Sequence, residues 1–211
     1  MRLIDLTLPI PEIEKGNSTL DLEEMHISAG GYNYTGMIYN FHHWSMSGTY
    51  IDFPGHIKET DDGYSAENYP LEKLYEVETV VLHLDRSNEL GLVTADELEA
   101  VCPDSTSAKG IIVNALGSKR FDEIAQRSVA FSKDSIEWIV SKGFHLMVSD
   151  IYESNDQPQN VFFDLFKGGV STVCYPVNLH LIDSHVVKLT VLTPRFPKAT
   201  QLPCRVVARL D

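Results

Sequence analysis

Residues 44–56, WSMSGTYIDFPGH, form the stretch that decides the fold. The stretch begins with aromatic and β-branched residues, which are typical of a β-strand, and its proline and glycine are typical of a sharp turn. A strand that runs into such a turn presents Asp52 and His56 close together. We therefore expect the chemistry of this chain, if it has any, to lie at these two side chains.

The same stretch resembles the signature of the cyclase family, the metal-dependent hydrolases that include bacterial kynurenine formamidase and isatin hydrolase. The family signature reads H-x-G-T-H-x-D-x-P-x-H, and five of its positions match here: Gly48, Thr49, Asp52, Pro54 and His56. Met46 and Tyr50 stand where the family has its two metal-binding histidines. The scaffold of the signature is kept, and its metal ligands are changed.

Four shorter motifs extend the resemblance along the chain. They occur in the family's order, at residues 5–10, 138–150, 169–179 and 202–208. The resemblance implies a single-domain α/β swivelling β/β/α fold over residues 1–211, with mixed sheets in a partly barrel-like layer packed against helices. It also implies a homodimer or a higher homo-oligomer.

The resemblance further implies one or two divalent metals, zinc or manganese, held by the signature residues and by a distal histidine and glutamate twelve residues apart. Counted along this chain, the distal pair falls on Phe162 and Cys174, so Asp52 alone keeps its family identity. Thioether, phenol and thiol groups do not form a site for a hard divalent ion. We expect no metal cofactor; if the site survives in altered form, Asp52 would hold zinc or manganese.

Roles for the remaining residues follow from their chemistry. The resemblance places His56 at a general acid/base position, where an imidazole with a pKa of about 6.5 can shuttle protons at neutral pH. Tyr50 could donate a hydrogen bond to a carbonyl oxygen, and Cys174 could act as a nucleophile if His56 lowered its pKa. Met46, Phe162 and Cys174 are the expected pocket residues. The resemblance implies a hydrolase of a small amide, formamide or cyclic amide.

Other interpretations stay open. In a non-catalytic member that binds a small molecule, Tyr50 and Phe162 would fill the space of the absent metal, and Cys174 would be a buried apolar residue. One of the adjacent His42 and His43 could also replace a ligand beside Asp52 and His56. Near Asp183, a metal could be bound by two further histidines, although histidines near a turn are usually solvated: His180 and His185.

The length, charge and cysteine content of the chain indicate which partners and which cellular compartment to expect. A chain of 211 residues with 43% hydrophobic content can bury a sizeable core, and we expect one domain. The net charge of −13 argues against nucleic acid and against an anionic membrane. Three cysteines without a C-x-x-C motif indicate neither a disulfide framework nor a structural zinc site. The first residues lack the apolar run of a secretory signal, so we expect the cytoplasm.

Periodicity predicts the order of the elements. Strands are expected at residues 2–10, 36–46, 77–85, 110–116, 144–150, 170–173, 186–192 and 205–210. Helices are expected from the capping box at Thr94, over 132–142 and over 162–166. Residues 11–35 are expected to be mainly loop, with a short strand near 25–27 and a break at Gly30 and Gly31. The strand-helix-strand unit over 110–150 predicts a parallel sheet covered by helices.

Overall fold

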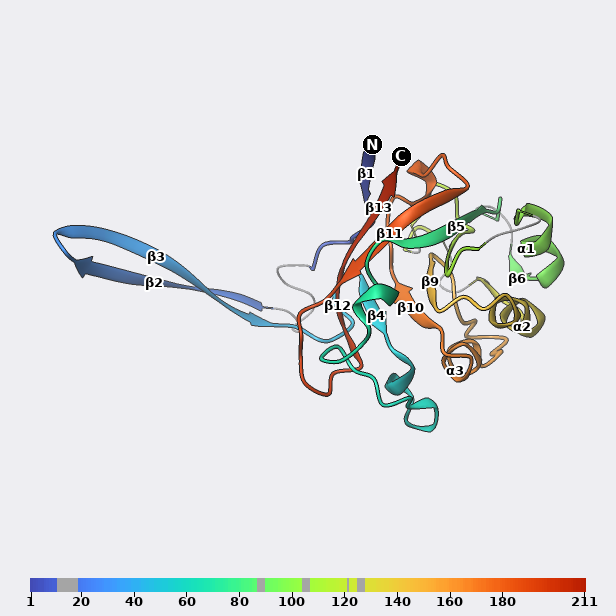
Figure 1. The fold of residues 1–211 in the computed structure, drawn as a ribbon, viewed down its shortest axis with the longest axis horizontal. Coiled ribbons are helices and arrows are strands. Elements are labelled where there is room, and N and C mark those ends of the chain that lie inside the picture. The colour runs from blue at the N-terminus through green and yellow to red at the C-terminus, as the bar shows by residue number, and fades with distance from the viewer. Residues whose placement is uncertain (11–18, 87–89, 104–106, 121, 125–127) are drawn as a thin grey trace.

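The chain folds into a body with a curled, mixed β-sheet and a long hairpin that stands away from it (Figure 1). The computed structural model describes residues 1–10, 19–86, 90–103, 107–120, 122–124 and 128–211. The sheet has nine strands in the order β1-β13-β11-β5-β7-β9-β10-β4-β12. Their bounds are Arg2–Asp5 (β1), Tyr50–Asp52 (β4), Val77–His83 (β5), Gly110–Asn114 (β7), Leu146–Ser149 (β9), Ser171–Cys174 (β10), Val186–Leu192 (β11), Gln201–Pro203 (β12) and Arg205–Leu210 (β13).

The centre of the sheet is parallel and its two sides are antiparallel. Strands β5, β7, β9 and β10 run parallel to one another, as the strand-helix-strand unit predicts. Three α-helices lie on one side of this centre: α1 (Ala95–Val101), α2 (Lys133–Ser141) and α3 (Val161–Lys167). A short parallel pair, β6 (Gly91–Val93) and β8 (Val129–Phe131), stands in a separate sheet. The mixed sheet packed against helices confirms the α/β prediction.

Side chains of the central strands point alternately to the two faces of the sheet, and each face has its own apolar cluster. In β7, Ile111 and Val113 point into the cluster that contains Ile136 of α2 and Leu165 of α3. Ile112 points the other way, into the cluster that contains Ile51 and Phe53. Successive side chains of a strand face opposite sides, so a continuous apolar run is what a strand covered on both faces requires.

The capping residues in the sequence predicted the ends of the helices correctly. Thr94 forms the predicted capping box with Glu97, and Ser132 caps α2. Gly143, which follows α2, has a φ of +76°, as a left-handed helix end requires. The strand bounds predicted for residues 186–192 and 205–210 agree with β11 and β13. No helix among the described residues is both long and apolar enough to cross a membrane.

The prediction of a loop over residues 11–35 was wrong for the part that the structure describes. Strands β2 (Thr19–Ala29) and β3 (Tyr32–His42) pair along their whole length. Gly30 and Gly31, at φ of +62° and +84°, form the two-residue turn that joins them. Residues 11–18 lie outside the described part of the chain.

Several strand boundaries also differ from the predictions. The strand expected over 36–46 ends at His42, and the first predicted strand ends at Asp5 rather than at residue 10. Strands β6, β8 and β12 have three residues each and were not predicted. Such short strands lack enough residues to establish a period of two. Four short 3-10 helices complete the described structure: η1 (Pro54–His56), η2 (Lys58–Thr60), η3 (Leu71–Lys73) and η4 (Leu179–Leu181).

Candidate functional site

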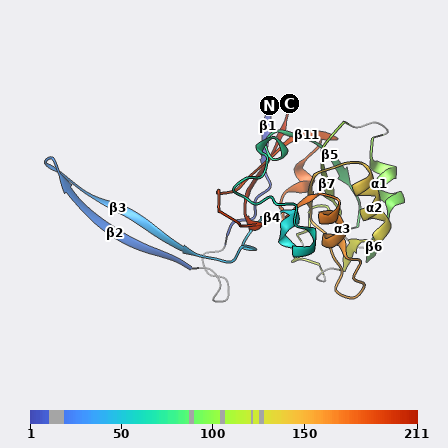
Figure 2. The same ribbon diagram turned by 60° about the horizontal axis from the view of Figure 1, so that its bottom comes forward.

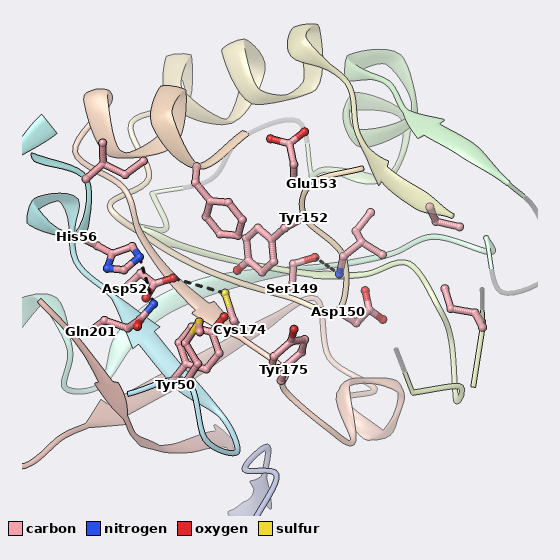
Figure 3. A pocket seen from close by; sticks show the side chains of 16 residues that line it. Tyr50, Asp52, His56, Ser149, Asp150, Tyr152, Glu153, Cys174, Tyr175 and Gln201 are labelled. Atoms are coloured by element: carbon pink, nitrogen blue, oxygen red, sulfur yellow. Dashed lines mark hydrogen bonds between the residues drawn. The ribbon is translucent and has the colours of Figure 1, made fainter. Parts of the chain in front are cut away.

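A cavity of about 290 Å³ opens beside β4 and η1, where the sheet meets α3 (Figure 3). Its wall is mostly aromatic and aliphatic, with a few polar groups. All six of the site residues predicted from the sequence contribute to this wall: Met46, Tyr50, Asp52, His56, Phe162 and Cys174. The structure therefore brings together residues that are separated by up to 128 positions in the chain.

The register of β4 explains which side chains meet. Tyr50 and Asp52 are two positions apart and face the same side, whereas Ile51 and Phe53 enter the core on the other side. Strand β10 places Cys174 opposite Tyr50. On its other edge, β4 pairs with β12. A central position between two antiparallel neighbours fixes both polar side chains of β4.

The signature residues Gly48 and Thr49 anchor the start of β4. The Thr49 hydroxyl donates to the Tyr175 carbonyl and accepts from the Leu8 backbone amide, both at 2.7 Å. Gly48 has a φ of +65°, and a Cβ at this position would lie 2.7 Å from the Leu8 carbonyl oxygen. The Gly-Thr pair thus ties the approach of β4 to a segment far away in sequence.

Gly48→Ala is expected to lower the free energy of unfolding by about 2 to 3 kcal/mol, because an L side chain meets both an unfavourable φ and a backbone atom. Urea unfolding followed by circular dichroism measures this. Gly63→Ala is the matched control: its φ is +81°, but no atom lies within 4 Å of the added Cβ. The control is expected to lose only about 1 kcal/mol. Equal losses in the two variants would contradict the role of the Leu8 contact.

Asp52 is a buried carboxylate, and few hydrogen bonds offset the cost of burying its charge. Its side chain is 3% exposed, and Oδ1 accepts no hydrogen bond from any described residue. Oδ2 accepts from the Cys174 thiol, with an Sγ to Oδ2 distance of 3.8 Å. Burial raises the pKa of Asp52 from 3.8 to about 6, although contacts with Gln201, His56 and Cys174 oppose the rise. Asp52 is therefore a reactive carboxylate with one free acceptor atom.

His56 lies at the end of η1, next to Asp52 and at the open side of the cavity. Its Nε2 is 3.2 Å from Nε2 of Gln201, whose Oε1 accepts from the Ser45 hydroxyl. Because the Gln201 oxygen is already used, its amide NH₂ faces the ring, and Nε2 of His56 is the acceptor. A ring nitrogen that accepts a hydrogen bond in this way can also accept a proton from another donor.

Gln201 is a site residue that the sequence did not reveal. Strand β12 places it opposite Asp52, although the two are far apart in the chain. No spacing rule relates Gln201 to the signature, and a glutamine beside prolines and threonines gives no chemical signal on its own. Its position follows from the sheet register.

Tyr50 and Cys174 are protonated groups in this environment. Burial, together with the neighbouring Cys174 and Asp52, raises the pKa of the Tyr50 phenol above its usual value of 10. Burial and the nearby Asp52 raise the pKa of the Cys174 thiol well above 9. A phenol that keeps its proton is a hydrogen-bond donor, and a thiol that keeps its proton is a poor nucleophile. These conditions suit the donor role for Tyr50 and oppose the nucleophile role for Cys174.

An aromatic wall faces these polar groups. The ring of Phe162, on α3, stacks on Tyr152 at a centroid distance of 5.1 Å, and it also contacts Phe166. Phe166 in turn lies edge-on to the imidazole of His56. Met46, 45% exposed, lies on the open side. Such a wall is typical of a site for a flat, apolar ligand.

Two further carboxylates line the cavity, and both accept hydrogen bonds from backbone amides. Asp150 accepts from the amides of Ala115 and Leu116 and from the Asn114 side chain, at 2.8 to 3.0 Å. Glu153 accepts from the Gln159 and Val161 amides at the start of α3. Both side chains hold loops in place.

The other candidate ligands lie elsewhere. His42 and His43 are exposed at the end of β3 and are not among the residues of the cavity wall. His180 and His185 are also exposed, and Asp183 pairs with Arg2 at 2.6 Å. Within the described residues, no group of three or more His, Cys, Asp or Glu side chains is arranged to hold a metal ion.

Comparison with known proteins gives the family. Residues 4–155 match the family model described as "Putative cyclase". The chain belongs to the cyclase family. A search of curated proteins finds no match.

Solved structures of the cyclase family share the fold. Isatin hydrolase A from Labrenzia aggregata bound to benzyl benzoate has a TM-score of 0.69 at 16% identity, with coverage of 98% of this chain and 93% of that one. Isatin hydrolase A from Ralstonia solanacearum has a TM-score of 0.70 at 17% identity, and the match covers 100% of this chain and 92% of that one. A predicted metal-dependent hydrolase from Bacillus stearothermophilus has a TM-score of 0.65 at 16% identity, and the match covers 98% of this chain and 97% of that one. At these identities the likeness concerns the fold.

The cavity does not fit the metal that the cyclase family implies. Around the free Oδ1 of Asp52, the other family ligand positions offer a half-exposed thioether, a protonated phenol, a phenyl ring and a protonated thiol. A hard divalent ion needs several carboxylate or imidazole ligands, and Asp52 is the one carboxylate in that set. The polar groups of the cavity are therefore considered by their own acid–base chemistry.

Proposed function

We propose that this cyclase-family chain hydrolyses the C–N bond of a small aryl formamide, amide or cyclic amide by acid–base catalysis without a metal. The observation that carries the proposal is the free, buried Oδ1 of Asp52 next to an imidazole whose Nε2 accepts a hydrogen bond. A carboxylate and an imidazole together can activate water and then protonate a leaving nitrogen.

His56 is the proton carrier in this mechanism. Its Nε2 takes a proton from a water molecule as the water oxygen attacks the substrate carbonyl carbon. The same nitrogen then returns the proton to the amide nitrogen as the C–N bond breaks. Gln201 positions the ring through its 3.2 Å contact with Nε2, and the contact must open when water enters. The exposed position of His56 gives water access to the reacting side of the cavity.

Asp52 and Tyr50 stabilise the charges that form. The Asp52 carboxylate stabilises the imidazolium, and the interaction is mutual, since the charge of His56 lowers the pKa of Asp52. Tyr50 keeps its proton and is placed to donate to the carbonyl oxygen as negative charge develops there. This donor takes the place that a Lewis acid has in a metal-dependent hydrolase.

The apolar walls support the substrate class. Phe162 and Tyr152 form a stacked pair on one side of a cavity of about 290 Å³, which suits one or two fused rings. The structural neighbours named isatin hydrolase point to a cyclic amide fused to an aromatic ring. Isatin and formanilide are therefore the first probes.

Hydrolysis of these probes is expected to continue after exhaustive treatment with a chelator, at a rate within about twofold of the untreated protein, because none of the proposed steps uses a metal. Elemental analysis of the same samples checks the metal content. As a control, zinc or manganese is added back to the treated protein and the rate of hydrolysis is measured again. If turnover disappears with the chelator and returns with either ion, the metal-free mechanism is wrong.

A non-catalytic, ligand-binding role is the second candidate. Met46, Tyr50 and Phe162 lie in the cavity wall, so that side chains fill the family's metal positions. This role predicts that isatin quenches intrinsic fluorescence in a saturable way while no product forms. Saturable binding without turnover would replace the hydrolase proposal.

A further inference from the structure

Tyr175 is a bulky residue in a backbone conformation that favours glycine. Its φ is +54°, in the left-handed region, whereas the proline that follows it favours an extended conformation at this position. Hydrogen bonds hold the turn on both sides. The Tyr175 carbonyl accepts from the Thr49 hydroxyl at 2.7 Å, and the Val177 amide donates to the Leu6 carbonyl at 3.0 Å. Bulky residues held in such conformations cluster at active sites and ligand clamps.

The left-handed conformation brings the Tyr175 ring into the cavity. Successive side chains of a regular strand face opposite sides, so a continued β10 would send Tyr175 to the side of Val173, which is in the apolar core. Instead Cys174 and Tyr175, which are neighbours in the chain, both line the cavity. In Figure 3 the ring of Tyr175 stands beside that of Tyr50, with its hydroxyl end towards the cavity. The strained turn therefore gives the cavity a second phenol.

The two phenols are close enough to act on one ligand. The ring centroids of Tyr50 and Tyr175 are 5.6 Å apart, and the rings are edge to face at an angle of 77°. Burial, Cys174 and Asp52 raise the pKa of the Tyr50 phenol, and the nearby Tyr175 adds to the rise. Each phenol carries one hydroxyl donor. Two donors at this spacing suit two adjacent oxygen atoms of one substrate.

Tyr175 stands at the end of the cavity opposite to His56. Strand β4 leads from Tyr50 through Asp52 into η1 and η2, and these short helices lie beside α3 in Figures 1 and 2. Strand β10 runs antiparallel to β4 and pairs Cys174 with Tyr50. Tyr175 is the next residue of the chain, so it lies beyond Tyr50, on the side away from Asp52 and His56.

We infer that Tyr175 is a specificity-determining residue, which donates a hydrogen bond to a second oxygen on the acyl side of the substrate. The inference rests on the proposed hydrolysis, in which the attacked carbon lies near His56 and Tyr50 holds its carbonyl oxygen. The leaving nitrogen and its aromatic ring then lie towards α3, where Phe162 forms part of the aromatic wall. The acyl substituent lies towards Tyr175.

This position of the second phenol narrows the substrate class. A donor beyond Tyr50 has a partner only if the scissile carbonyl carbon carries a further oxygen-bearing group. A cyclic amide with a second, adjacent carbonyl, as in isatin, supplies that acceptor. A formamide carries only a hydrogen atom at the same place. The inference therefore separates two substrates that the proposed function groups together.

Tyr175→Phe tests the inference, because it keeps the ring contact with Tyr50 and removes only the hydroxyl. We expect kcat/KM for isatin to fall about tenfold, mainly through KM, and kcat/KM for formanilide to stay within about twofold of the wild type. Tyr64→Phe is the matched control, since Tyr64 is an exposed tyrosine outside the cavity wall. Both rates of the control should stay within about twofold.

Titration calorimetry on the same proteins makes the test independent of turnover. Isatin should bind Tyr175→Phe about tenfold more weakly than it binds the wild type. Oxindole, which lacks the second carbonyl, should bind both proteins equally. If this difference is found while neither isatin nor formanilide is hydrolysed, the proposed hydrolysis is wrong and the assignment of Tyr175 stands.

Three results overturn the assignment. The first is an equal loss for isatin and for the probes with one carbonyl, which would mean that the Tyr175 hydroxyl supports the cavity as a whole. The second is no change for any probe, which would leave only a structural role for the ring. The third is a wild type that does not bind isatin. Circular dichroism confirms that each variant is folded.

Discussion

His56→Ala is expected to lower kcat/KM for isatin or formanilide hydrolysis by about 10,000-fold, because the variant has no group to carry the proton from water to the leaving nitrogen. The effect should fall on kcat rather than on KM, since the substrate packs mainly against the aromatic wall. Steady-state kinetics at pH 7 measure both constants. His42→Ala is the matched control, because His42 is an exposed histidine that does not line the cavity.

Two outcomes would contradict the assignment to His56. The first is turnover by His56→Ala at the wild-type rate, which would mean that another group transfers the proton. The second is an equal loss in His42→Ala, which would indicate that the change in activity has nothing to do with the cavity. Added imidazole should partly restore the rate of His56→Ala, because free imidazole can occupy the space of the missing ring.

The sequence located one half of this site and could not locate the other. The spacing from Tyr50 to His56 is local, so the signature predicted their grouping directly. Counting from the family pattern also led to Phe162 and Cys174, which line the same cavity. Gln201 was missed because its place beside Asp52 depends on the pairing of β12 with β4. Sheet register of this kind is set by the tertiary fold and not by local sequence.

The β2–β3 hairpin was not predicted from the sequence, for a different physical reason. A half-buried strand shows strict alternation, and residues 19–42 alternate in one phase near the base and in the other phase near the tip. Over the whole segment the two phases cancel, and the pattern becomes that of a polar loop. Gly30 and Gly31, interpreted as a break, are the two-residue turn that permits the pairing.

Asp52→Asn is expected to lower kcat/KM by about 1,000-fold and, in the same protein, to raise the free energy of unfolding at pH 7 by up to about 3 kcal/mol. The loss of activity follows because a neutral amide does not stabilise the imidazolium of His56. The gain in stability follows because burial of the ionised Asp52 is costly, which is why its pKa rises from 3.8 to about 6.

The sign of the pH dependence is the reverse of that for a salt-bridged aspartate. A raised pKa means that the native state binds the proton more tightly than the unfolded chain does, so the stability of the wild type falls as the pH rises from about 4 to about 6. Below this range Asp52 is protonated in both states, and Asp52→Asn should match the wild type. Activity runs the other way, because the mechanism needs the ionised carboxylate and should decline below a pH of about 6.

Urea unfolding at several pH values, with kcat/KM measured alongside, separates these effects. Asp150→Asn is the matched control, since Asp150 is a half-buried carboxylate of the same cavity wall. Its oxygens accept three hydrogen bonds, and the amide nitrogen of an asparagine cannot accept any of them. Burial raises the pKa of Asp150 as well, but the variant leaves at least one of these donors without its acceptor, so this control should lose about 1 to 3 kcal/mol, whereas Asp52→Asn gains stability. If Asp52→Asn also loses stability at pH 7, other groups of the native protein stabilise the ionised carboxylate, and the assignment of Asp52 as a carboxylate destabilised by burial is wrong.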